Sequence, residues 1–319
     1  MTSPPSACRR SVHSPRARIG KTAAEAVRAL ANIRIADGIA DAACTQLKQE
    51  WSTVESLGLW HAVILGVLEG LTEFLPVSST GHLIIAEDAM GVNDARGKVF
   101  AIFIQFGAIL AVCVAYRAKL LEVAGGLLGG DASARRFLVN VLIAFLPAMA
   151  FGFVLHGLIK THLFSPVTVA VALIIGGVII IWVEARPRRP RVRDIDDMTW
   201  LDALKVGLCQ CVALFPGASR AGSTIIGGML VGLSRETATR FSFFLAMPTM
   251  AAAVTYDLYK NAAILSWDDA GVFAAGFVAA FITALVTVQA LLAYVSRHSF
   301  TPFGWYRIVL GCVVLWYFW

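Results

Sequence analysis

The sequence predicts an all-α polytopic membrane protein made of two halves in an inverted repeat, each with one re-entrant helix pair and three transmembrane helices. Hydrophobic residues make up 58% of the 319 residues, and charged residues only 15%. Several apolar runs approach the roughly 20 residues with which a helix crosses about 30 Å of hydrocarbon. Two further apolar segments are interrupted by polar residues, and the interruptions recur about 140 residues apart, at Pro76 and at Pro216.

The net charge of +6 does not indicate nucleic-acid binding, because many basic residues lie in short loops between apolar runs. Membrane proteins carry such loops on the cytoplasmic side. The six cysteines include no CxxC pair, and most lie inside apolar segments, as small buried hydrophobes do. We therefore expect membrane lipids around the chain and no nucleic-acid partner.

The first 57 residues differ in kind from the rest. Arg, Ser and Pro dominate their beginning, and an Ala-rich stretch with helical spacing follows. The continuous apolar core of a cleavable signal peptide does not occur there. We predict a polar extension over residues 1–57, disordered or partly helical, ahead of a membrane domain over residues 58–319.

The first half of the membrane domain, about 58–184, begins with an interrupted segment. Pro76 and Gly81 break its apolar pattern, which predicts two short helices, 60–75 and 80–91, meeting at a loop inside the membrane. Such a loop is tolerated only where protein or water surrounds it, which is where a site forms. Three predicted spans follow it, over residues 98–117, 137–159 and 166–184.

The second half, about 200–319, repeats this order. Its interrupted segment covers residues 201–233, and Pro216 precedes Ser219 by three residues, as Pro76 precedes Ser79. The predicted spans that follow are residues 238–259, 270–295 and 303–319. Because three crossings per half is an odd number, the second half is inverted relative to the first, with a site near the midplane.

Basic residues orient the predicted spans. The connections that carry most of them all fall on one side of the membrane, which we assign to the cytoplasm; they hold Arg117, Lys119, Arg135, Arg136, residues 186–193 and Arg297. Both termini then lie in the periplasm.

The first interruption carries two carboxylates. Glu69 and Glu73 are four residues apart and share one helix face. They repel each other unless a divalent cation or a shared proton lies between them, and ionisable residues in an apolar segment indicate function. The alternative is a pair of separately satisfied acids near a helix end.

Hydroxyl groups and an imidazole follow these carboxylates. Ser78, Ser79 and Thr80 precede His82 at the expected start of the second short helix. The free N–H groups of a helix N-terminus suit a phosphate, and His82 is placed to exchange a proton with Ser79 or with a leaving oxygen. A simple helix cap is the alternative for these hydroxyl groups.

The second interruption supplies a positive charge. Arg220 offers a fork of donors that matches phosphate oxygens. Gly217 and Gly222 permit close backbone approach, and Ser219 and Thr224 add hydroxyl groups. Carboxylates for a cation or proton, together with an arginine and hydroxyl groups for an anion, describe a phosphoryl-transfer site.

The two motifs, EGLTEFLPVSSTGH and PGASRAGST, resemble those of the undecaprenyl-diphosphatase family of bacitracin-resistance proteins. The resemblance covers residues from about 58 to 319. It implies hydrolysis of undecaprenyl diphosphate, a polyprenyl diphosphate lipid, to the monophosphate and phosphate, which recycles the lipid carrier for cell-wall synthesis. It also implies a location in the bacterial cytoplasmic (inner) membrane, a site open to the periplasm and a requirement for Mg²⁺ or Ca²⁺.

The resemblance also implies roles for single residues. Glu69 and Glu73 match the acidic pair, which would bind the metal, and Ser79 with His82 matches the proposed nucleophile and base. Arg220 matches the phosphate-binding arginine and is predicted to be catalytic together with these four residues. The predicted substrate-binding groups are Ser78, Thr80, Gly217, Ser219, Gly222 and Thr224. Ala221 departs from the family, which commonly has a serine after the arginine.

A polyprenyl-phosphate transporter or flippase is the competing function, because inverted repeats with broken helices and buried acids are typical of transporters. The sequence leaves open whether Ser79 forms a phosphoseryl intermediate or positions a water. It also leaves open whether the chain forms a homodimer.

Overall fold

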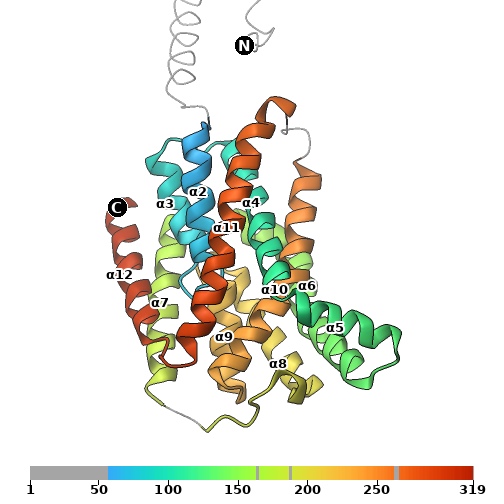
Figure 1. The fold of residues 1–319 in the computed structure, drawn as a ribbon. Coiled ribbons are helices and arrows are strands. Elements are labelled where there is room, and N and C mark those ends of the chain that lie inside the picture. The colour runs from blue at the N-terminus through green and yellow to red at the C-terminus, as the bar shows by residue number, and fades with distance from the viewer. Residues whose placement is uncertain (1–56, 163–164, 187–188, 262–265, 319) are drawn as a thin grey trace, which may run out of the picture. The chain divides into compact units, whose positions relative to one another are not determined.

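The computed structural model describes residues 57–162, 165–186, 189–261 and 266–318 (Figure 1). The predicted extension over residues 1–57 lies outside the described residues except for its last position. Within the described ranges the chain forms helices and no strands, which confirms the predicted all-α class. The principal helices are α2 (Leu59–Thr72), α3 (Ser79–Ala89), α4 (Ala95–Ala115), α5 (Arg117–Leu128), α6 (Ala132–His162), α7 (Pro166–Glu184), α8 (Trp200–Gln210), α9 (Arg220–Val231), α10 (Arg235–Lys260), α11 (Ala270–Val295) and α12 (Thr301–Phe318).

The first interrupted segment forms two short helices, as predicted. Helix α2 ends at Thr72, and α3 begins at Ser79. Pro76 disfavours helical backbone at the residue before it, so the chain turns between the two helices. Ser78, the residue before α3, has a φ of 72°, a left-handed conformation that is uncommon outside glycine. Residues 73–78 are called the first break below.

The second interrupted segment has the same design. Helix α8 and a short 3₁₀ turn over Cys211–Leu214 lead into a bend, after which α9 begins at Arg220. Ser219, the residue before α9, has a φ of 70°. Two serines at equivalent positions therefore share one rare backbone conformation, which matches the predicted recurrence. Residues 215–219 are called the second break.

Five helices are long and apolar enough to cross a membrane among the described residues: α4, α6 through Leu155, α7, α10 and the segment Trp267–Val295 that contains α11. This confirms a multi-pass membrane protein. Large apolar side chains lie exposed on these helices, as expected beside lipid, with Phe153 81% and Val154 75% accessible. The sixth predicted span forms α12, which packs along α7.

Helix α5 is an element that the sequence reasoning left as part of a loop. It follows α4 after Tyr116, covers Arg117–Leu128 and projects to one side of the bundle (Figure 1). Its Ala, Leu, Glu and Lys residues favour helix, but the segment is too short and too polar to cross the membrane. Lys119 anchors it by an ion pair to Asp196, 2.9 Å away.

Equivalent helices of the two halves pack against equivalent partners. Helix α2 packs on α11, and its counterpart α8 packs on α6, the counterpart of α11. Glycines permit both approaches: a Cβ at Gly70 would lie 2.6 Å from the carbonyl oxygen of Ala280, and one at Gly207 would overlap the Ala144 carbonyl. In Figure 1, α2 and α3 occupy the upper half of the bundle, and α8 and α9 the lower half. This arrangement is consistent with an inverted repeat, whose symmetry stays a prediction.

Candidate active site

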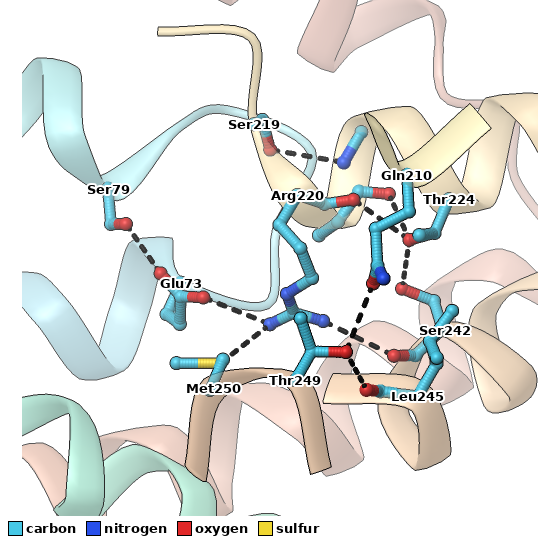
Figure 2. Close-up of polar contacts among 12 residues, drawn as sticks. Glu73, Ser79, Gln210, Ser219, Arg220, Thr224, Ser242, Leu245, Thr249 and Met250 are labelled. Atoms are coloured by element: carbon cyan, nitrogen blue, oxygen red, sulfur yellow. Dashed lines mark hydrogen bonds and ion pairs between the residues drawn. The ribbon is translucent and has the colours of Figure 1, made fainter. Parts of the chain in front are cut away.

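An ion pair joins the two breaks. Arg220, the first residue of α9, donates from Nη2 to Oε1 of Glu73 at 3.0 Å. Both side chains are largely buried, at 12% and 9% accessibility. Ser79, the first residue of α3, donates from Oγ to the other carboxylate oxygen of Glu73 at 2.5 Å. Figure 2 shows the three side chains converging, and they are called the Glu73 cluster below.

The Arg220 guanidinium group keeps donor capacity. Nη1 donates to the carbonyl oxygen of Ser242 at 3.2 Å, and Nη2 also contacts Sδ of Met250 at 3.2 Å. The group lies over the Phe74 ring, 5.4 Å from its centroid. Nε is buried and has no hydrogen-bond partner among the described residues. Since a guanidinium group carries five N–H donors, Arg220 can bind a further anion.

Glu69 lies one turn before Glu73 on α2 and is fully buried. Neither of its carboxylate oxygens has a hydrogen-bond partner among the described residues. A buried carboxylate is costly unless a cation or a proton neutralises it. The side chain therefore fits the predicted cation or proton.

The donor set suits a magnesium-like ion better than a closed metal cage. Within the described ranges, no group of three or more His, Cys, Asp or Glu side chains could hold a metal. Glu69 and Glu73 provide two carboxylates, and Glu73 already accepts from Arg220 and Ser79. Mg²⁺ commonly binds through one or two carboxylates together with water and substrate phosphate. The residues present fit that mode.

His82 is placed differently from the sequence expectation. Its Nδ1 lies 2.8 Å from the carbonyl oxygen of Ser78, and because a carbonyl only accepts, Nδ1 carries the proton. Its Nε2 lies 2.7 Å from the hydroxyl oxygen of Tyr306, against which the imidazole stacks. The structure thus joins Ser79 to a carboxylate and His82 to a tyrosine. Proton transfer between Ser79 and His82 stays a prediction.

Most of the predicted substrate-binding groups in the second break and in the first turns of α9 make contacts within the protein. Ser219 Oγ accepts from the amide of Gly222 at 3.0 Å and so caps α9. Thr224 Oγ1 lies 2.6 Å from Oγ of Ser242. Gly217 has a φ of 87°, and a Cβ there would lie 2.5 Å from the Val169 carbonyl oxygen, so this position requires glycine. These groups shape the second break.

The two remaining predicted groups lie at the end of the first break and in the first turn of α3. Ser78 is buried and holds His82 through its carbonyl oxygen. Thr80 is half-buried at the start of α3, beside Ser79.

Sequence reasoning missed Tyr306 and Arg307 of α12. Tyr306 holds His82, and Arg307 hydrogen-bonds to the backbone of both breaks. A signal existed for Arg307, because it is a lone basic residue in an apolar segment, as Arg220 is. Ser242 and Met250, which contact Arg220 from α10, carry no such signal (Figure 2).

Comparison with known proteins identifies the family of this chain. The family model described as bacitracin resistance protein BacA matches residues 62–313. The chain is 57% identical over 258 residues to undecaprenyl-diphosphatase 2 of Rhodospirillum rubrum, covering 81% of this chain and 94% of that protein. It is 58% identical over 257 residues to the undecaprenyl-diphosphatase of Nitrosospira multiformis, with the same two coverages.

A third relative, the undecaprenyl-diphosphatase of Methylococcus capsulatus, is 56% identical over 255 residues, which cover 80% of this chain and 93% of that protein. The matched region contains both breaks and all helices that contribute to the Glu73 cluster. The family resemblance predicted from the two motifs is confirmed, and the chain belongs to the bacitracin resistance protein BacA family.

Proposed function

We propose that this chain hydrolyses undecaprenyl diphosphate to undecaprenyl phosphate and inorganic phosphate, thereby recycling the lipid carrier for cell-wall synthesis and conferring bacitracin resistance. The observation that carries the proposal is the Glu73 cluster, which brings a hydroxyl, a carboxylate and a guanidinium group together between two breaks. The names of the relatives supply the substrate.

Arg220 binds the diphosphate in this proposal. Its buried Nε and its remaining Nη1 hydrogen are free to donate to phosphate oxygens. A phosphate that binds there competes with Glu73 for the guanidinium group. Substrate binding therefore weakens the ion pair between Arg220 and Glu73.

Glu73 then serves as the proton acceptor. Ser79 Oγ already donates to it at 2.5 Å, which is within the reach that general-base catalysis requires. The hydroxyl proton passes to Glu73 as the oxygen of Ser79, or of a water that Ser79 positions, attacks the terminal phosphorus. The bond from that phosphorus to the bridging oxygen breaks, and undecaprenyl phosphate leaves. If water attacked, inorganic phosphate is formed in this step and Glu73 returns the proton to solvent. If Ser79 attacked, a water then attacks the phosphoryl group on Ser79, the bond from Ser79 Oγ to phosphorus breaks, Oγ takes back a proton, and inorganic phosphate leaves.

We also propose that Glu69 and Glu73 bind a divalent cation, Mg²⁺ or Ca²⁺. The partnerless oxygens of Glu69 support this proposal. When bound, the cation would neutralise charge on the phosphoryl oxygens. The Glu73 cluster is complete within one chain, so the reaction as proposed needs no second subunit.

We place the protein in the bacterial inner membrane, with the site reached from the periplasm. Helices α7 and α11 both end in the lower part of Figure 1. Arg186 and Arg193 follow the end of α7, Arg297 follows the end of α11, and Arg235 pairs with Glu184 at the end of α7. Basic residues mark the cytoplasmic side of a membrane protein. The opposite end of the bundle would then face the periplasm.

Phosphate release from undecaprenyl diphosphate by the purified protein in detergent tests the function. We expect release that stops on addition of EDTA and is lost in Glu73→Gln. Glu87→Gln is the matched control, because Glu87 is another buried carboxylate of the first half and lies outside the Glu73 cluster. Movement of the lipid across a vesicle membrane without phosphate release would instead establish the flippase function.

A further inference from the structure

Arg307 of α12 is buried to 1% accessibility, and within the described part of the chain its guanidinium group donates hydrogen bonds to backbone oxygens. Its nitrogens donate to five carbonyl groups: Nε to Leu173 at 3.3 Å, Nη1 to Pro76 at 3.3 Å and Ala218 at 3.1 Å, and Nη2 to Ala172 at 3.2 Å and Gly217 at 3.0 Å.

These contacts use all the donors of the side chain. A guanidinium group has five N–H donors, and here five carbonyl oxygens accept from them. No donor remains for a phosphate oxygen, so Arg307 differs in role from Arg220, whose Nε is partnerless among the described residues. No carboxylate is among these acceptors, so pairing with an acid does not explain why this charge is buried.

The acceptors belong to three separate segments. Pro76 lies in the first break, Gly217 and Ala218 lie in the second break, and the remaining two carbonyl groups belong to α7. One nitrogen, Nη1, bonds to both breaks at once. Ser79 follows Pro76 by three residues, and Arg220 follows Ala218 by two. The guanidinium group therefore governs how far apart these two site residues lie.

The surrounding helices leave a slot that fits this group. A Cβ at Gly176 of α7 would overlap the guanidinium group of Arg307, and one at Gly222 of α9 would lie 3.1 Å from its Nη1. The preceding residue of α12, Tyr306, bonds to His82 of α3. Two consecutive residues of one helix thus hold the start of α3 and both breaks.

We propose that Arg307 is a positioning residue that holds the two breaks at the separation which the Glu73 cluster requires. The proposal rests on the proposed function for its catalytic consequence, but its structural content can be measured without substrate. Displacement of a reacting group by about 1 Å can cost about 100-fold in rate. We therefore expect Arg307→Met to lower kcat by about that factor while KM changes little, because Arg220 remains to bind phosphate.

Hydrogen exchange of the full-length protein in detergent measures the structural effect directly. Arg307→Met should speed exchange in the segments over residues 73–79 and 215–220 and leave α4 unchanged, because only the two breaks lose their shared donor. Arg307→Lys keeps the charge with fewer directed donors, and we expect a smaller change in both exchange and kcat.

A second pair of variants covers the case in which Arg307→Met fails to fold. Gly176→Ala leaves Arg307 in the chain but displaces its guanidinium group, and it should reproduce the faster exchange and the lower kcat. Gly311→Ala is the matched control: its Cβ also presses on α7, 2.8 Å from the Ala170 carbonyl oxygen, but contacts no guanidinium atom. It should leave exchange in both breaks unchanged.

Two results for Gly176→Ala would overturn the proposal. One is hydrogen exchange at the wild-type rate in both breaks, and the other is faster exchange with an undiminished kcat. Faster exchange in both breaks together with a lower kcat in Gly176→Ala, and neither in Gly311→Ala, would support it. A wild-type protein that releases no phosphate would contradict the proposed function alone, because exchange in the breaks is measured without substrate.

Discussion

The substitution Glu73→Gln separates binding from turnover in the Glu73 cluster. The carboxylate accepts from Ser79 at 2.5 Å and pairs with Arg220 at 3.0 Å. The amide has nearly the same shape but neither the charge nor the basicity. We expect kcat to fall by about 10²- to 10⁴-fold, the usual contribution of a general base.

The same substitution should tighten phosphate binding, because phosphate no longer competes with Glu73 for Arg220. With charge centres about 4 Å apart and an effective dielectric constant of about 20, the pair attracts by about 4 kcal/mol. The desolvation of the two buried groups offsets much of this. A remainder of about 1.4 kcal/mol would make phosphate binding about tenfold tighter.

Isothermal titration with inorganic phosphate, beside steady-state hydrolysis of undecaprenyl diphosphate, measures both effects on the same preparation. Glu87→Gln should match the wild-type protein in both assays. Phosphate binding to Glu73→Gln that is no tighter than wild type would refute the competition between phosphate and Glu73. A kcat within threefold of wild type would remove Glu73 from proton transfer. Such a decrease is far smaller than the roughly 10²-fold loss expected on removal of a general base.

Three further substitutions test other parts of the structure. Glu69→Gln replaces a buried carboxylate whose oxygens have no hydrogen-bond partner among the described residues, so the protein should fold with at least wild-type thermal stability. It should bind Mg²⁺ at least about tenfold more weakly by titration. Unchanged Mg²⁺ affinity would remove Glu69 from the metal site. Arg220→Lys keeps the charge but loses the fork, and kcat/KM should fall by about tenfold or more, whereas wild-type kinetics would show that charge alone suffices. Gly70→Ala places a methyl group 2.6 Å from the Ala280 carbonyl oxygen, and thermal unfolding should show about 1–3 kcal/mol of lost stability. Unchanged stability would show that α2 and α11 can move apart without cost.

Local signals in the sequence identified most helices and both breaks. The apolar runs and the prolines at positions 76 and 216 predicted where the helices stop, because proline restricts its own backbone and that of the preceding residue. Helix α5 escaped this reasoning. Its leucines recur at helical spacing, but it is short and carries three charged residues in twelve, which is typical of a connection between two spans; Val123 is its one buried residue.

The same signals identified the proposed reacting groups but not their pairing. Glu73 and Arg220 were marked as functional because each is charged within an apolar segment, although they lie 147 residues apart. The sequence spacing favoured His82 as the partner of Ser79. The fold instead turns Ser79 toward Glu73 and His82 toward Tyr306, 224 residues away. Ser78, whose backbone is left-handed, directly precedes Ser79 at the start of α3.

By itself, the sequence thus determined the membrane class, the two breaks and the chemical kinds of group that gather there, since each follows from hydrophobicity, proline geometry and charge along neighbouring residues. Only the tertiary structure decided which donor meets which acceptor. Arg307 shows why: its acceptors are backbone oxygens, which every residue possesses. No residue type marks such an acceptor in advance, so its role depends on the packing of α12 against α7 and the two breaks.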